Sequence, residues 1–266
     1  SIRSHRRPNE VVNVLVCVKR VPSPGAKINI TADGQGVDTA YLAFTTSPHE
    51  ECAVEAAIQL VELHGGGATV LTLGPVEADE QLRYAASVGV GNCVLLPIEG
   101  ADWDPQRTAR AIAGAISNLE ARGGPFDLIL FGNESADAGN FQVGVRVAHA
   151  LGRPMVNGVK GIEVQGGAIR ARREADAGVE VYSVPMPAVL GVKEGINLPR
   201  YPTLRGRLAS KKVAIAELPP SAEPGGQRMV TLLPSVEPAS HTIMLGTGVQ
   251  AVPAIVDLLD ELGLLR

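Results

Sequence analysis

The chain has 266 residues, of which 45% are hydrophobic, 20% are charged and only 3% are aromatic, and its formal net charge is −4. This composition indicates a globular protein with one large domain and room for an appendage. The negative charge and the scarcity of aromatic rings argue against a nucleic-acid-binding surface, which needs positive charge and stacking side chains.

Targeting segments and covalent cross-links are not indicated by the sequence. No apolar run reaches the roughly 18 residues that can cross a bilayer, and no hydrophobic segment follows the basic residues at positions 3–7. We therefore expect no membrane insertion, no secretory signal and a cytoplasmic location. Cys17, Cys52 and Cys93 each lie in an apolar context without CxxC spacing. They are expected to be buried, reduced thiols that form neither a disulfide nor a metal site.

The first half of the chain predicts strands that alternate with helices. Apolar runs predict four buried strands, at residues 11–21, 68–73, 93–97 and 126–131. Helical periodicity predicts a helix after each of them, at residues 48–64, 77–88, 105–122 and 143–151. A polar excursion with a small hairpin near residues 27–34 separates the first strand from the first helix. Such alternation is typical of a doubly wound, mainly parallel α/β sheet with right-handed crossovers.

A ligand site is predicted where the winding of this sheet reverses. For a strand order 3-2-1-4-5 the reversal lies between the first and fourth strands, and ligands bind beyond the carboxyl ends of the strands at that point. Residues 17–20 and 132–142 then line one crevice. Gly132, Gly139 and Gly144 would let a phosphate approach the main chain closely. The alternative reading of this loop by itself is an ordinary connection in an α/β domain.

The first predicted helix has a well-defined start. Ser47 is a capping residue, Pro48 occupies the first helical position and Glu50 completes a capping box. This helix N-terminus lies at the same edge of the predicted sheet as the crevice. It can therefore be a structural cap alone, or a cap that also faces a phosphate or ribose.

The second half of the chain has a different pattern. Short antiparallel strands are predicted at residues 156–164, 168–174 and 179–184, followed by another apolar strand at 187–192. The remaining segments are an irregular stretch at 193–204, a proline-rich linker at 218–240 and an amphipathic helix at 249–265. We expect an α/β domain at residues 1–217 and a linker with a C-terminal helical arm at residues 218–266.

Catalytic motifs are not found in the sequence. The segment Gly246–Ala251 imitates a GxGxxA fingerprint, but the chain ends one helix later, without the second strand and acidic residue that a dinucleotide site needs. There is no Walker lysine loop, no GxSxG elbow and no HExxH sequence. The five histidines are scattered and fit surface or capping positions better than catalytic ones. We therefore expect a protein that is not an enzyme by itself.

Four segments carry a resemblance to a known family. They are VLVCVKRV at 14–21, SPHEECAVEA at 47–56, GNESADAGNFQVG at 132–144, and RREADAGVE at 172–180 together with LPRYPTL at 198–204. In this order and spacing they resemble the beta subunit of electron transfer flavoprotein, the ETF beta or FixA family, over about residues 11–265. The third segment is similar to the family pattern GKQAIDGDSGQVG, with Asn133 and Glu134 in place of Lys and Gln.

The resemblance implies an adenine nucleotide alpha-hydrolase-like fold and an obligate heterodimer with an alpha subunit that holds most of the FAD site. The dimer accepts electrons from flavin dehydrogenases and passes them onward to an acceptor such as a quinone oxidoreductase. The beta subunit holds a structural AMP in many members, and a second FAD in electron-bifurcating members. The C-terminal helix resembles the arm that reaches the alpha subunit.

The resemblance also assigns site residues. The residues expected at the nucleotide are Cys17, Ser47, Pro48, His49, Glu50, Leu73, Gly132, Asn133, Glu134, Ser135, Ala136, Asp137, Ala138, Gly139, Asn140, Phe141, Gln142 and Val143. Those expected at the partner dehydrogenase are Glu194, Gly195, Ile196, Asn197, Leu198, Pro199, Arg200 and Tyr201. Ile196 matches the apolar anchor of the family's recognition loop, and we expect it to be an exposed hot spot.

Two other function classes share the predicted fold. One is a stand-alone adenine-nucleotide-binding module of the stress-protein type, which needs no alpha subunit and leaves residues 155–217 and the C-terminal arm without a purpose. The other is an ATP-consuming ligase of related fold, which is disfavoured because the chain contains no SGGxDS or HIGH-type sequence.

Overall fold

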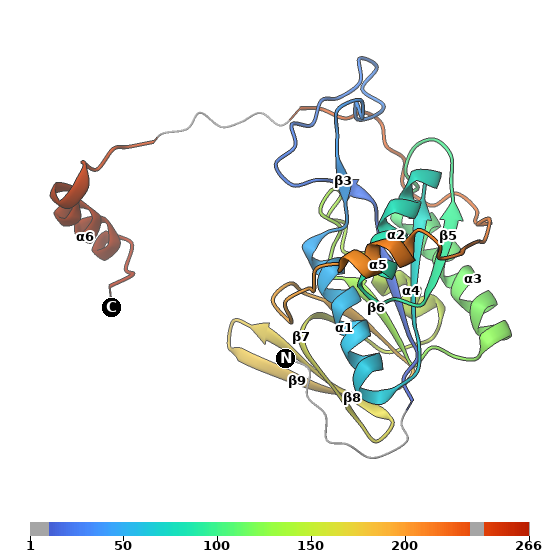
Figure 1. Ribbon diagram of the computed structural model, residues 1–266. Helices are drawn as coiled ribbons and strands as arrows, with labels where there is room; N and C mark the ends of the chain where they lie inside the picture. The colour runs from blue at the N-terminus through green and yellow to red at the C-terminus, as the bar shows by residue number, and fades with distance from the viewer. Residues whose placement is uncertain (1–10, 235–241, 266) are drawn as a thin grey trace. The chain divides into compact units, whose positions relative to one another are not determined.

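The computed structural model describes residues 11–234 and 242–265 (Figure 1). The chain divides into two compact units, with the boundary between Thr231 and Leu232. The main sheet of the first unit contains β1 (Val14–Val18), β4 (Ala68–Gly74), β5 (Asn92–Pro97), β6 (Leu128–Gly132), β7 (Met155–Gln165), β8 (Ala168–Ala175), β9 (Gly178–Pro185), β10 (Ala188–Val192) and β11 (Ile215–Glu217). Its helices are α1 (Pro48–His64), η1 (Val76–Ala78), α2 (Asp79–Val88), α3 (Pro105–Gly123), α4 (Val143–Ala150) and α5 (Leu204–Ser210).

The strand order confirms the predicted topology. The strands of the described residues run in the order β11-β5-β4-β1-β6-β10-β7-β8-β9. The five neighbours β5, β4, β1, β6 and β10 are parallel and follow the predicted order 3-2-1-4-5. β7, predicted as an antiparallel strand, pairs antiparallel with β8 but parallel with β10, whereas β8 and β9 pair antiparallel as expected for the added segment.

Helices cover both faces of the parallel sheet, and the alternation of side chains in β1 explains why. Val14 and Val16 belong to the core beneath α1 and α2, whereas Leu15 and Cys17 belong to the core beneath α3 and α4. All five residues of β1 are buried. A central strand with both faces covered must be apolar throughout, which is the pattern seen in the sequence.

The start of α1 confirms the predicted capping box. The Ser47 hydroxyl accepts a hydrogen bond from the Glu50 N–H at 3.3 Å, and the Glu50 carboxylate accepts one from the Ser47 N–H at 3.0 Å. Gly65 ends the helix with φ +80°. Its positive φ is a conformation that glycine adopts without steric cost.

Some predicted elements differ from the structure. The first strand ends at Val18 because the N–H of Lys19 turns away to donate to the Glu50 carboxylate at 2.9 Å. A separate two-stranded sheet pairs β2 (Val21–Pro22) with β3 (Phe44–Thr45). The expected hairpin near residues 27–34 consists of one isolated bridge between Ile30 and Val37. Helix α5 and strand β11 were not predicted.

Residues 218–226 belong to the first unit and are bonded to it although they have no regular secondary structure. The Leu218 N–H donates to the Leu95 carbonyl at 2.9 Å, and the Gly225 N–H donates to the Asp104 carboxylate at 3.0 Å. The Arg107 guanidinium donates to the Ala222 carbonyl at 3.1 Å. After the edge strand β11, this segment therefore runs past β5 to the start of α3.

The second unit contains the short 3-10 turn η2 (Gly248–Ala251) and the helix α6 (Val252–Glu261). The helix predicted at residues 249–265 is therefore shorter than expected. The apolar side chains of α6 are largely exposed, including Val252, Ile255 and Val256 at 42–50%. In the described parts of the chain, no helix combines the length and the apolarity that crossing a bilayer requires.

Candidate functional site

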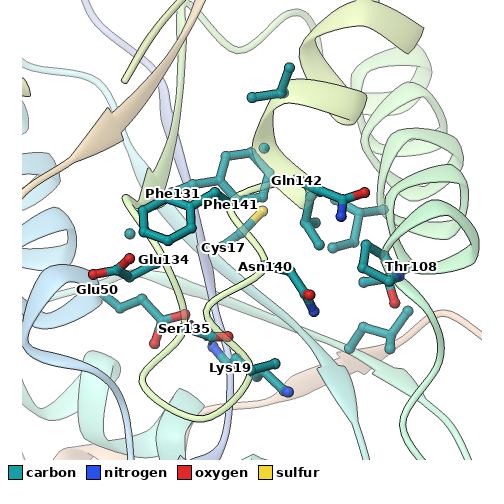
Figure 2. Close-up of a pocket in the computed structure, with 18 of the residues that line it drawn as sticks. Cys17, Lys19, Glu50, Thr108, Phe131, Glu134, Ser135, Asn140, Phe141 and Gln142 are labelled. Carbon is teal, nitrogen blue, oxygen red and sulfur yellow. Dashed lines mark hydrogen bonds between the residues drawn. The ribbon is translucent and has the colours of Figure 1, made fainter. Parts of the chain in front are cut away.

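A pocket lies at the carboxyl ends of the central parallel strands (Figure 2). Cys17 of β1 pairs in register with Phe131 of β6, and both residues line the pocket, as do Leu73 of β4 and Ile98 just after β5. The predicted crevice between the first and fourth strands is therefore confirmed. The switch point of the sheet is the place where such folds bind ligands.

The structure brings most of the predicted nucleotide residues together at this pocket. The pocket is lined by Cys17, Glu50, Leu73, Gly132, Asn133, Glu134, Ser135, Ala138, Asn140, Phe141, Gln142 and Val143. The predicted residues outside the lining are Ser47, Pro48, His49, Ala136, Asp137 and Gly139. Ser47 contributes indirectly, because its hydroxyl accepts a hydrogen bond from the N–H of Glu50, which lines the pocket.

One wall of the pocket was missed by the sequence reasoning. It consists of Asp102 and Trp103 in the loop after β5, and of Pro105, Thr108 and Ile112 in the first turns of α3. The signal that could have found this wall is positional. The carboxyl end of the third predicted strand lies at the same edge of the sheet as those of the other parallel strands.

The glycines around the pocket serve the packing of the protein itself. A Cβ on Gly132 would lie 2.7 Å from Cγ of Glu50 and 3.2 Å from Cβ of His49. A Cβ on Gly144 would lie 3.0 Å from the methyl group of Met155. Gly132 thus lets the first turn of α1 approach β6, and Gly144 lets α4 approach the sheet, rather than only making space for a ligand.

The loop between β6 and α4 is anchored at its start. The Asn133 N–H donates to the Val192 carbonyl at 2.8 Å, and the Asn133 side-chain oxygen accepts from the Gly158 N–H at 2.9 Å. Within the loop, the Gly139 N–H donates to the Ser135 carbonyl at 3.1 Å. These bonds hold the loop over the carboxyl ends of β6 and β10.

A lysine between two aspartates fixes the outer side of the pocket. The ammonium of Lys19 lies 2.7 Å from the Asp102 carboxylate and 2.6 Å from the Asp137 carboxylate. Burial opposes the charged forms, but the mutual attraction outweighs it, so the pKa of Lys19 is raised and the pKa of Asp137 is lowered. Lys19 therefore stays charged and ties the loop at Asp137 to the end of β1.

Glu50 is a buried carboxyl group on the inner wall of the pocket. Burial raises the pKa of Glu50 to about 8, although the N–H groups of Ser47 and Lys19 donate to the carboxylate and oppose the rise. A large fraction of Glu50 is therefore protonated and uncharged near neutral pH. The sequence indicated its capping role but not this protonation.

His49 connects the loop after β6 with the segment predicted to meet a partner. The Glu194 N–H donates to Nδ1 of His49 at 2.9 Å, and Nε2 of His49 lies 3.2 Å from the Glu134 carboxylate. Because Nδ1 accepts a hydrogen bond, Nε2 carries the proton that is donated to Glu134. The imidazole is therefore a link between two predicted sites, which its position in the sequence did not reveal.

The segment at residues 194–201 corrects one prediction. Ile196 was expected to be exposed, but it is 3% exposed and belongs to the core cluster that includes β10 and α1. Leu198 and Tyr201 are each 88% exposed. The apolar residues that this segment presents to the outside are therefore Leu198 and Tyr201. Ile196 packs inward because the irregular chain between β10 and α5 crosses over α1.

Arg200 holds the same segment on α1. Its guanidinium donates to the buried Glu55 carboxylate at 2.8 and 3.0 Å and to the Glu62 carboxylate at 2.6 and 2.9 Å. These two carboxylates raise the pKa of Arg200 further above its ordinary value. Arg200 therefore acts as an internal brace, although it belongs to the residues predicted at a partner.

Comparison with known proteins agrees with this geometry. Residues 36–223 match the electron transfer flavoprotein domain. The chain belongs to this family. It is 34% identical to the electron transfer flavoprotein subunit beta of Bacillus subtilis. The 209 aligned residues cover 78% of this chain and 79% of that relative. It is also 37% identical to the electron transfer flavoprotein subunit beta of Syntrophomonas wolfei. The 206 aligned residues cover 77% of this chain and 79% of that relative.

Membership of the electron transfer flavoprotein family confirms the resemblance read from the sequence. The role is thus electron transfer, and these relatives are named as electron transfer subunits. In the described part of the chain, no group of three or more histidine, cysteine, aspartate or glutamate side chains could hold a metal ion. The described site consists instead of main-chain groups, apolar walls and a few charged side chains.

Proposed function

We propose that this chain is the beta subunit of a heterodimeric electron transfer flavoprotein and that its pocket holds a structural AMP. The subunit contributes binding, distance and electrostatics rather than a catalytic constellation. The redox chemistry is that of an FAD held mostly by the alpha subunit. The observation that carries the proposal is the pocket at the switch point of the sheet, in a chain of this family.

The residues of the pocket fit an adenine nucleotide. Apolar side chains such as Ile112 and Phe131 form part of the pocket walls, while Asn140 and Gln142 bring amide groups to the lining. Lys19 is the only lysine or arginine among the described residues that line it, and two aspartates already engage it. A phosphate would therefore depend mainly on main-chain N–H groups at the start of α4 and in the preceding loop.

The second unit supports an alpha subunit as the permanent partner. Isolated helices of the length of α6 are marginal in water, so an apolar face such as Ile255 and Leu258 needs a surface to cover it. An arm that docks on another chain explains this exposure. The cytoplasmic location stays a prediction from the sequence.

Docking of the partner dehydrogenase is assigned to Leu198, and a pair of substitutions tests it. Leu198→Ala is expected to weaken the complex with the cognate dehydrogenase by about 2 kcal/mol, as truncation of an exposed apolar anchor does. Its effect on unfolding should be small, because Leu198 is 88% exposed. Ile196→Ala is expected instead to lower the free energy of unfolding by about 3 kcal/mol, since it leaves a cavity.

The measurements are steady-state electron transfer from the dehydrogenase and urea unfolding of both variants. If Leu198→Ala transfers electrons as the unmodified chain does at every dehydrogenase concentration, the docking assignment is wrong.

The cofactor content tests the proposed function directly. The chain, co-expressed with its alpha subunit and purified, is denatured, and the released FAD and AMP are counted by chromatography. We expect one FAD and one AMP per heterodimer. Two FAD and no AMP per heterodimer would indicate instead an electron-bifurcating flavoprotein with a second FAD in this subunit. A chain that is a stable monomer by itself and binds ATP would favour the stand-alone module and contradict the proposal.

A further inference from the structure

The backbone at Phe141 is unusual. Phe141 has φ +56° and is the only residue other than glycine with a positive φ among the described residues. A side chain in the left-handed region clashes with its own backbone, and the clash is most costly for bulky residues. The chain therefore keeps an aromatic ring where glycine would be free of strain.

The ring of Phe141 does not serve the core. It is 57% exposed, although it belongs to the pocket lining (Figure 2). Phe131 on the same pocket is 7% exposed and packs with the sheet. An exposed ring in a strained backbone adds little to folding stability. Strain of this kind persists where the surroundings over-determine it, and it gathers at ligand sites.

The surroundings of Phe141 do hold the loop in place. Asn133 anchors its start to the Val192 carbonyl, Asp137 is tied to Lys19, and α4 begins two residues after Phe141. The next residue back, Asn140, is exposed, and its side chain makes no hydrogen bond to another described residue. Phe141 and Asn140 are adjacent in the loop and both line the pocket, which therefore offers an aromatic ring and an amide. Such a pair suits a planar heterocycle, with a face to stack on and an edge that accepts and donates hydrogen bonds.

We propose that Phe141 is the stacking residue of the nucleotide site, and that it selects ligands with a planar aromatic ring. This inference rests on the proposed function of the same pocket. The ring that stacks on Phe141 is the adenine of AMP or the isoalloxazine of a flavin. The backbone strain at Phe141 holds the side chain at the pocket before the ligand binds. Binding then loses less conformational entropy, because the loop and the ring are already ordered.

The test compares the full chain with three variants, each purified with the alpha subunit, whose own FAD is retained, and freed of the nucleotide bound in this chain. Phe141→Gly removes the ring and the strain together, Phe141→Leu keeps an apolar side chain, and Phe141→Tyr keeps the ring. Titration calorimetry is carried out with AMP, with FAD and with ribose 5-phosphate, which lacks the aromatic ring. Thermal unfolding is followed in parallel.

We expect Phe141→Gly to raise the Kd for AMP about tenfold or more, the range that loss of one stacking partner causes. Phe141→Leu should lose a similar factor, and Phe141→Tyr should bind as the unmodified chain does. Ribose 5-phosphate should bind equally to all four proteins. Phe141→Gly should unfold at the same or a higher temperature, because it removes the backbone strain together with the ring. Weaker AMP binding without a loss of folding stability would distinguish a stacking role of Phe141 from a packing role. A larger loss for FAD than for AMP would identify the stacked ring as a flavin.

Several outcomes would overturn the inference. Equal AMP affinity of Phe141→Gly and the unmodified chain, or an equal loss for AMP and ribose 5-phosphate, would remove the stacking role while leaving the proposed function intact. A variant that binds AMP normally but associates weakly with the alpha subunit would make Phe141 an interface residue. If the unmodified chain bound neither AMP nor FAD, the proposed function would fail first and the inference with it.

Discussion

Replacement of Arg200 by methionine is expected to lower the free energy of unfolding by about 2–3 kcal/mol, because it leaves the buried Glu55 carboxylate without its cation. Glu55 is 4% exposed, and in the variant it keeps two neutral donors, the Gln59 amide at 2.6 Å and the main-chain N–H of residue 200 at 3.2 Å. The Glu62 carboxylate also loses its partner, but it is exposed to water and its loss should cost little. The segment that carries Leu198 would then be less firmly held on α1.

Urea unfolding of Arg200→Met measures this effect, and Arg205→Met is the matched control. Arg205 lies exposed at the start of α5, only five residues away. Its replacement should change the unfolding midpoint by little. The double variant Arg200→Met with Glu55→Gln should recover part of the loss, because it removes the unpaired charge as well. Equal stability of Arg200→Met and Arg205→Met would show that the ion pairs of Arg200 do not brace the fold.

Stability of the chain is expected to fall as the pH rises from about 5 to about 8, and Glu50 is the group responsible. Its pKa is raised by burial from 4.5 to about 8 in the folded chain. Between these values the unfolded chain has released the proton and the folded chain still holds it, so higher pH favours unfolding. The contribution is present below about pH 5 and is lost as the pH passes through the folded-state pKa. Its size is on the order of 3 kcal/mol.

Glu50→Gln should remove most of this slope. The variant loses one of the two main-chain hydrogen bonds that the carboxylate accepts, from Ser47 and Lys19, which lowers its stability by a similar amount at every pH. The diagnostic quantity is therefore the dependence of the urea midpoint on pH between 5 and 8, rather than the midpoint at one pH. Glu80→Gln, on the exposed side of α2, should keep the slope of the unmodified chain. A Glu50→Gln profile parallel to that of the unmodified chain would mean that Glu50 is ionised in the folded protein.

Local signals in the sequence were sufficient for the alternating strands and helices in the first half of the chain. The continuous apolar run around β1 and the capping box of Ser47 and Glu50 depend on neighbours within a few residues, so they can be read directly. The alternation of strands and helices then leaves few topologies, because parallel crossovers are right-handed. The position of the pocket follows from that topology, which is why residues 17–20 and 132–142 were predicted to line it.

Burial and protonation could not be read in this way. Ile196 and Leu198 are two residues apart and both apolar, yet one lies in the core and the other is almost fully exposed. Their difference is set by the path of an irregular segment over α1, and no periodicity describes such a path. The pKa of Glu50 likewise depends on its enclosure by β1, β6 and the following loop.

The sequence by itself determined the alternation of strands and helices in the first half of the chain, the family and the edge of the sheet where the pocket lies, because hydrophobic periodicity, caps and motifs are properties of neighbouring residues. The tertiary structure alone decided the rest. It placed Asp102 and Asp137 on either side of Lys19, joined His49 to Glu134 and Glu194, and turned the ring of Phe141 into the pocket lining. These contacts link residues up to 145 positions apart, and only the folded chain brings their charges and hydrogen-bonding groups within reach.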